Sequence, residues 1–259
     1  MDRAVSTVLD VAICLLLVGV AIGTLTAAIP DDGRSSTVDG DAEATSVGTV
    51  TATVPTDGGR SAHGTLAQHL ARATVVGATV EGERLVTSRY PDATVAAVEN
   101  ATGDRVRVTT RWIPYPGAPV RGRLSAGASP PSTADVATTR LVVDTGVSAP
   151  RAATAPFATA LAGTFVDLLF PPERTRIRLV DPRTAAPTAD RYRNAADTLG
   201  TDVEEPIGNA YPNQANERLA TELADRVEDD LDSRNNGTDA VPPDAAPGEV
   251  EIVVRRWEP

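Results

Sequence analysis

The chain has 259 residues and a formal net charge of −11, from 35 acidic residues and 24 basic residues, and it contains one cysteine and two histidines. Every basic residue is an arginine. The missing lysine excludes a P-loop nucleotide site and a Schiff-base enzyme, because both need a lysine amine. A single cysteine excludes cysteine zinc sites and a disulfide framework. The acidity argues against general nucleic-acid binding, which needs a basic surface.

The acid excess, with arginine in place of lysine and many Ala, Val, Thr and Asp residues, predicts a protein of a salt-loving organism. Carboxylates keep a protein surface hydrated when salt competes for water. Their mutual repulsion is screened there, because the Debye length falls to about 3 Å at 1 M salt. The alternative is an ordinary acidic protein from a GC-rich genome, which also explains the missing lysine.

In chain order, the first predicted element is an uncharged hydrophobic segment over residues 11–29. About 20 apolar residues span the hydrocarbon core of a bilayer, so this segment predicts a transmembrane helix. Arg3 precedes it and two aspartates follow it, which predicts a cytoplasmic N-terminus over residues 1–10 and export of the rest. A single-pass anchor in the cell membrane is favoured by the length of the segment. A cleaved export signal is the alternative.

Residues 30–45 are rich in Asp, Gly, Ser and Thr, which predicts a solvated linker. The exported domain is then expected over residues 46–232. A β-branched run at 47–54 predicts its first strand. Apolar residues at helical spacing predict a helix from Ser61 to about Gly77.

Residues 105–112 alternate between apolar and basic side chains, which predicts a strand with Val106, Val108, Thr110 and Trp112 on one face. Turn-forming residues at 114–119 and a second alternating run at 120–125 complete a hairpin. Residues 141–143 predict a third core strand.

Residues 152–170 form the most apolar run outside the N-terminus, with Phe157, Leu161 and Phe165 on one helical face. A core helix is predicted, and a second membrane span is the alternative. An acidic amphipathic helix is predicted over 213–232, a loop over 233–248 and a last strand over 249–259, docked into a sheet. The predicted fold class is α+β: one exported domain with a mostly antiparallel sheet and helices packed on it.

Two stretches carry a resemblance to known proteins. Residues 2–8, DRAVSTV, run straight into the hydrophobic segment and resemble the start of haloarchaeal type IV pilins, with Thr7 where those proteins usually have proline. Residues 62–67, AHGTLA, and 111–119, RWIPYPGAP, resemble an uncharacterised haloarchaeal family of pilin-like, membrane-anchored proteins. The resemblance implies assembly roles for Arg3 and for Asp10, since an acidic residue near the start of a pilin helix pairs with a neighbour's N-terminus. The alternative for Asp10 is a carboxylate satisfied by water.

The clearest candidate surface is basic. Arg105, Arg107 and Arg111 lie on one strand face, with Arg121 and Arg123 across the hairpin. Such a ribbon predicts docking of an acidic partner, with the acidic helix of a neighbouring subunit as one candidate. The alternative is that these arginines pair with carboxylates of their own domain.

Asn100 and Asn236 each begin an N-x-[ST] triplet in a turn-like stretch, so both are candidate glycosylation acceptors. His63 and His69 are six residues apart and do not form a metal-binding pair on one helix face, so both are expected at the surface or at a helix edge. Residues 122–127, GRLSAG, miss a nucleophile elbow by one residue. No catalytic residue, metal site, cofactor or small-molecule substrate is therefore predicted.

We expect a single-pass, pilin-like cell-surface protein of a halophilic archaeon, a structural or accessory subunit of a pilus-like assembly rather than an enzyme. Its expected partners are the membrane and pilin-like subunits, and nucleic acid is not among them. The alternatives are a membrane-anchored extracellular binding module outside any filament and a cell-wall-associated enzyme.

Overall fold

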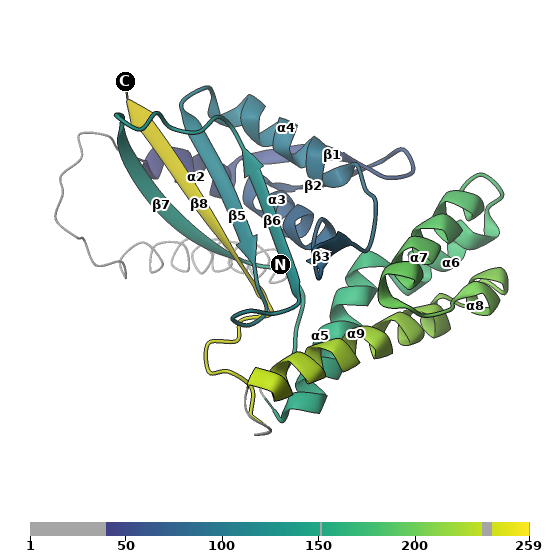
Figure 1. Ribbon diagram of the computed structural model, residues 1–259. Helices are drawn as coiled ribbons and strands as arrows, with labels where there is room; N and C mark the ends of the chain where they lie inside the picture. Colours follow the sequence, from purple (N-terminus) through teal and green to yellow (C-terminus); the bar gives the residue numbers. More distant parts are fainter. Residues whose placement is uncertain (1–39, 151, 235–239, 259) are drawn as a thin grey trace, which may run out of the picture. The chain divides into compact units, whose positions relative to one another are not determined.

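A six-stranded antiparallel sheet organises the protein in the computed structural model, which describes residues 40–150, 152–234 and 240–258 (Figure 1). The described residues belong to one compact unit, residues 38–259. The predicted transmembrane helix with Arg3 and Asp10, and the first part of the linker, lie outside the described residues. In spatial order the strands are β4 (Glu83–Arg84), β3 (Thr79–Val80), β6 (Val120–Ala126), β5 (Val106–Trp112), β8 (Glu249–Glu258) and β7 (Asp135–Asp144).

Strand β8, from the end of the chain, lies between β5 and β7 and is antiparallel to both. Its alternating Val250, Ile252 and Val254 are fully buried, as are Val106 and Val108 on β5. The predicted β5–β6 hairpin and the predicted docking of the C-terminal strand are both confirmed.

The third predicted core strand is corrected. Residues 141–143 belong to β7, which is an edge strand, and Val142 is 48% exposed. Because β8 takes the central position, β7 pairs among the described strands with β8 alone, and polar residues such as Thr138 and Arg140 are tolerated on it.

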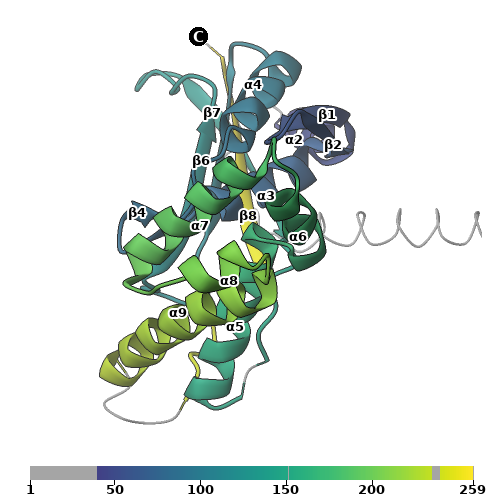
Figure 2. The ribbon, with the colours of Figure 1, turned by 90° about the vertical axis from the view of Figure 1, so that its right-hand side faces the viewer.

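One layer packs against a single face of the sheet. Figure 2 shows helices and a hairpin on the same side of the strands. The layer consists of α2 (Asp41–Thr49), the hairpin of β1 (Thr51–Thr56) and β2 (Arg60–Thr65), α3 (Leu66–Val76) and α4 (Tyr90–Thr102).

Three predicted boundaries in this layer are wrong. Residues 41–45 are helical rather than linker, and the strand predicted at 47–54 begins only at Thr51, because α2 buries Ala44 and Val47 against the core. The helix predicted from Ser61 begins at Leu66. Thr65 caps it: its hydroxyl accepts from the Gln68 N–H at 3.2 Å, and the Gln68 side chain accepts from the Thr65 N–H at 2.9 Å.

A group of helices lies beyond one end of the strands (Figure 1). Its members are α5 (Thr154–Leu169), α6 (Pro172–Val180), α7 (Ala185–Leu199), α8 (Glu204–Gly208) and α9 (Pro212–Arg234). Helices α5 and α9 are the predicted core helix and acidic amphipathic helix, and both are confirmed: Phe157, Leu161 and Phe165 on α5 are buried, as are Leu219 and Leu223 on α9.

Within the described ranges, no single helix has the length and hydropathy that a membrane crossing requires. Helices α5 and α6 reach those values only as a pair, across a bend of 43°. The apolar face of α5 packs inside the protein, as the core-helix prediction requires.

Four fully buried aromatic side chains join the sheet to the helix group. Trp112, at the end of β5, stacks on Phe165 with ring centroids 5.3 Å apart, and Tyr115 meets Phe157 edge-on at 6.1 Å. The Trp112 Nε1–H donates to the Pro247 carbonyl at 2.8 Å, which satisfies the one polar group of the indole. The predicted turn at 114–119 is confirmed, and it carries Tyr115 into this junction.

Gly122 on β6 sets how closely α3 approaches the sheet. A Cβ at this position would lie 2.2 Å from the Thr74 carbonyl oxygen of α3. Thr74 also hydrogen bonds through its hydroxyl to Thr110 of β5, at 2.5 Å. The glycines of the GRLSAG stretch therefore serve close packing, since a Cβ at Gly127 would lie 2.1 Å from the Val106 carbonyl oxygen.

Gly122→Ala is expected to lower the free energy of unfolding by about 3 kcal/mol, because the added methyl group pushes α3 away from β5 and β6. The matched control is Gly163→Ala on α5, where a Cβ meets nothing within 4 Å. That change is expected to raise stability by about 1 kcal/mol. Urea unfolding followed by circular dichroism measures both, and equal effects of the two changes would contradict the packing argument.

Candidate docking face

The face of the sheet opposite α2, α3 and the β1–β2 hairpin is covered by no helix of the described part (Figure 2). Side chains alternate along each strand, so the positions next to the buried ones point outward here. The outward positions include five arginines, which together we call the arginine face: Arg107 and Arg111 on β5, Arg121 and Arg123 on β6, and Arg255 on β8.

The strand register sets these arginines against one another. Arg111 lies directly opposite Arg123 across the β5–β6 pair, and Arg107 lies directly opposite Arg255 across the β5–β8 pair. Like charges at directly opposite positions destabilise a sheet by up to about 1 kcal/mol per pair. The fold therefore carries a local electrostatic cost on this face.

One carboxylate offsets part of that cost, because Glu251 on β8 lies directly opposite Arg111 across the β5–β8 pair. Arg107 donates to the Ser129 hydroxyl. None of the five arginines forms an ion pair with any residue that the structure describes. Nearby, Arg140 on β7 does pair with Glu251 on β8, at 3.4 Å, and the inward-facing Arg256 pairs with Glu43 of α2 at 2.8 Å. Among the described residues, the predicted arginines thus form no ion pair within their own domain, although Glu251 faces Arg111 across the strands.

The remaining predicted residues lie apart from this face or outside the described part. Arg105 is exposed just before β5 begins. Asn100 is exposed in the last turn of α4, a helix rather than the turn-like stretch expected, and Asn236 lies outside the described residues. Arg255 was missed, because only the long-range register of β8 places it beside Arg107.

Both histidines make hydrogen bonds to neighbouring residues of the domain. His63 is exposed, and its Nδ1 lies 2.8 Å from the Thr53 hydroxyl. His69 was expected at the surface or at a helix edge, but it is buried: its Nδ1 lies 2.7 Å from the Tyr90 hydroxyl and its Nε2 lies 3.1 Å from the Ala52 carbonyl oxygen. Among the described residues, no group of three histidine, cysteine or carboxylate side chains could hold a metal ion.

Comparison with known proteins identifies a family. A family model described as a family of unknown function, DUF7284, matches residues 9–257, so the chain belongs to this family. No curated protein and no solved structure matches the chain. The family description carries no activity, and the pilin resemblance therefore stays a prediction.

Arg123→Thr is expected to raise the free energy of unfolding by about 0.5–1 kcal/mol at low salt, because it removes the repulsion with Arg111 and introduces a good strand former. The gain is expected to shrink in concentrated salt. Denaturant unfolding of Arg123→Thr, Arg111→Thr and the double variant measures the coupling directly.

The control for that series is Arg84→Thr on β4, an exposed arginine whose opposite residue is Thr79. It makes the same chemical change without a like charge across the strands. A coupling of zero between positions 111 and 123, or an equal gain from Arg84→Thr, would show that the face carries no electrostatic cost.

Proposed function

We propose that this chain is a single-pass, pilin-like cell-surface protein of a salt-loving archaeon, whose exported domain docks onto a neighbouring subunit through the arginine face. The observation that carries the proposal is the pairing of Arg111 with Arg123 and of Arg107 with Arg255. These arginines form no ion pair with any described residue, and only Arg111 has a carboxylate, that of Glu251, at a directly opposite strand position. The face therefore supplies guanidinium groups for acidic groups brought by another molecule.

The neighbour's matching surface is the acidic side of α9 in a second copy of this chain. Glu222, Asp225 and Glu228 lie along the solvent side of that helix, and Asp225 is exposed. None of the three forms an ion pair with a residue in the described ranges. A row of carboxylates on a helix and a row of guanidinium groups on a sheet are complementary in charge.

High salt weakens the electrostatic attraction between the two docking surfaces. At about 1 M salt the Debye length is about 3 Å, so long-range attraction between the two faces is screened. Only direct contacts keep their strength, and the planar guanidinium group makes two parallel hydrogen bonds to one carboxylate. Arginine, which supplies every positive side chain here, suits this requirement better than lysine.

Membrane attachment rests on the sequence. The uncharged segment 11–29 is long enough to span a bilayer. The family match begins at residue 9, so it includes this segment together with the domain.

Docking is tested on the full chain by replacing Arg111 and Arg123 together with glutamate. We expect at least a tenfold loss of association between two differently tagged copies, and loss of incorporation into filaments, because carboxylates then face the acidic helix. The matched control is Arg84→Glu with Arg176→Glu, two exposed arginines on other elements. Adding Glu222→Arg and Asp225→Arg to the partner copy is expected to restore association.

Unchanged association of the Arg111→Glu, Arg123→Glu protein would refute the docking role. A third outcome has two parts: the variant loses association, and the unmodified protein associates but does not enter filaments. That outcome would favour a membrane-anchored binding module.

Attachment is tested by intact mass and N-terminal sequencing of the native protein from separated membrane and medium fractions. We expect a membrane-bound chain that begins within the first few residues, because the anchor is retained. A chain in the medium that begins near Ile29 would overturn the anchored interpretation and leave a secreted domain.

A further inference from the structure

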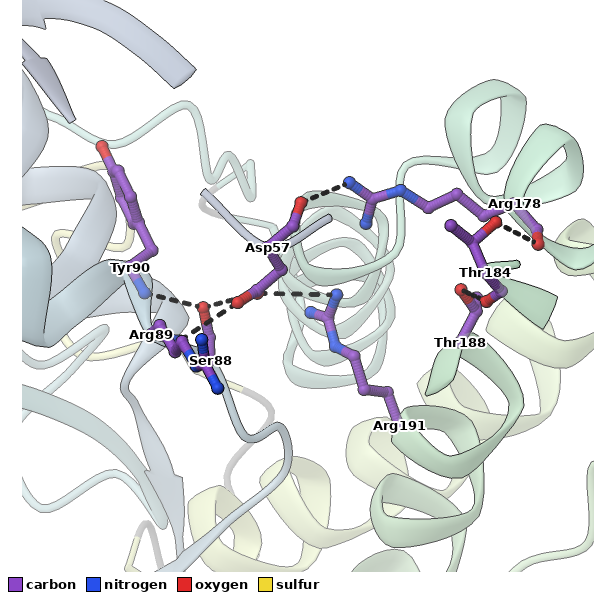
Figure 3. Close-up of polar contacts among 8 residues, drawn as sticks. All are labelled: Asp57, Ser88, Arg89, Tyr90, Arg178, Thr184, Thr188 and Arg191. Atoms are coloured by element: carbon purple, nitrogen blue, oxygen red, sulfur yellow. Dashed lines mark hydrogen bonds and ion pairs between the residues drawn. The ribbon is translucent and has the colours of Figure 1, made fainter. Parts of the chain in front are cut away.

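A second concentration of positive charge lies where the β1–β2 turn meets α6 and α7 (Figure 3). Four arginines, which we call the arginine cluster, come together there: Arg60 at the start of β2, Arg174 and Arg178 on α6, and Arg191 on α7. The carboxylate that faces Arg178 and Arg191 is that of Asp57, in the turn between β1 and β2.

The Asp57 carboxylate accepts hydrogen bonds from two neutral donors. Its Oδ2 accepts from the Ser88 hydroxyl at 2.7 Å, and its Oδ1 accepts from the Arg89 backbone N–H at 3.1 Å. Arg191 approaches the carboxylate only to 3.9 Å, which is too long for a hydrogen bond. Arg178 donates to the backbone carbonyl of Asp57, at 3.0 Å, and not to its carboxylate. One carboxylate therefore offsets the cluster only in part.

Arg191 is largely buried, and one of its hydrogen-bond donors has no partner among the described residues. Its side chain is 20% exposed, and its guanidinium lies over the Phe170 ring at 5.6 Å. Its Nε is buried and has no hydrogen-bond partner among the described residues. Leaving a buried donor unsatisfied costs about 1–3 kcal/mol, more for a charged group, and such a group in a native protein calls for a partner.

The electrostatics agree with the geometry. Burial lowers the pKa of Arg178, and the positive charges of Arg191, Arg60 and Arg174 lower it further. Burial also lowers the pKa of Arg191. Both shifts mean that the surroundings disfavour positive charge, so an anion bound here would be held by charge as well as by hydrogen bonds.

The turn that bears Asp57 packs directly beside Arg178. Gly58 follows Asp57 with φ +79°, a backbone conformation that favours glycine. A Cβ at Gly58 would lie 3.5 Å from the Arg178 guanidinium, which is ordinary van der Waals contact.

We propose that the arginine cluster is a binding site for a phosphate-class oxyanion, with Arg178 and Arg191 as direct ligands and with Arg60 and Arg174 at its rim. Guanidinium groups are planar forks that bind tetrahedral oxyanions through paired hydrogen bonds. Asp57 accepts from Arg178 through its backbone carbonyl and faces Arg191 through its carboxylate, so it positions both ligands while offsetting their charge only in part. This site is separate from the arginine face and does not depend on the docking proposal.

A phosphate group reaches this site from one of two sources: as a free ion or as the headgroup of an anionic lipid. The second source has a structural basis, because Ile177 and Val180 on α6 are 66% and 67% exposed. Exposed apolar residues beside arginines on one helix suit the surface of an anionic membrane.

The test uses the full chain in a neutral detergent, titrated with inorganic phosphate at constant ionic strength set by chloride. We expect a saturable rise in the thermal midpoint and a calorimetric binding signal. Arg178→Gln and Arg191→Gln are each expected to weaken phosphate affinity about tenfold or more. The matched control is Arg176→Gln, an exposed arginine on the same helix, which is expected to bind phosphate as the unmodified protein does.

Because Arg191 is largely buried, its variant could fail to fold, and Arg174→Gln supplies a second test at an exposed position. It is expected to weaken phosphate affinity several-fold without loss of folding. A second arm adds phosphatidylglycerol or phosphatidylcholine to the detergent. If phosphatidylglycerol alone raises the midpoint and removes the phosphate effect, the site takes a lipid headgroup. If the phosphate effect persists, it takes the free ion.

Two outcomes would overturn the proposal. One is the absence of a saturable phosphate or phosphatidylglycerol effect beyond the chloride reference. The other is an effect that is equal in the unmodified protein, Arg174→Gln and Arg178→Gln, which would place binding elsewhere.

Discussion

The contact between the end of β5 and helix α5 holds the two parts of the described domain together. The chain has three phenylalanines, four tyrosines and two tryptophans, and four of these side chains are fully buried at this contact. Stacking of Trp112 on Phe165 fixes the direction in which the helix group leaves the sheet. Since aromatic side chains bury the most apolar area per residue, a chain with so few of them depends on their placement. The arginine cluster depends on this arrangement, because α6 and α7 belong to the helix group.

The two basic surfaces arise in different ways. The arginine face follows from strand pairing, which sets Arg111 beside Arg123 and Arg107 beside Arg255 on a solvated sheet surface. The arginine cluster follows from helix packing, which brings α6 and α7 against the β1–β2 turn and buries Arg191 over Phe170. In a chain of net charge −11, positive charge is thus gathered at two places.

Local patterns predicted the elements whose burial repeats regularly along the chain. The alternation at 105–112 and the apolar stripes of α5 and α9 each specify one buried face, and the structure has those faces. Local patterns do not predict contacts between residues that are far apart in the sequence. Helix α2 forms because Ala44 and Val47 find the core, β7 is an edge strand because β8 is inserted beside it, and Arg191 meets Asp57 only through tertiary packing. Four of the five arginines of the arginine face could be predicted, and the arginine cluster could not.

The place of β8 in the sheet has a consequence for the order of folding. Residues 106–111 pair with residues 251–256, and among the described strands β7 pairs with β8 alone. Strand β7 therefore stays apart from the rest of the sheet until residues 249–258 are available. Pairings across such long separations form slowly. The β5–β6 hairpin is consequently able to form early, while the sheet that contains it is completed late.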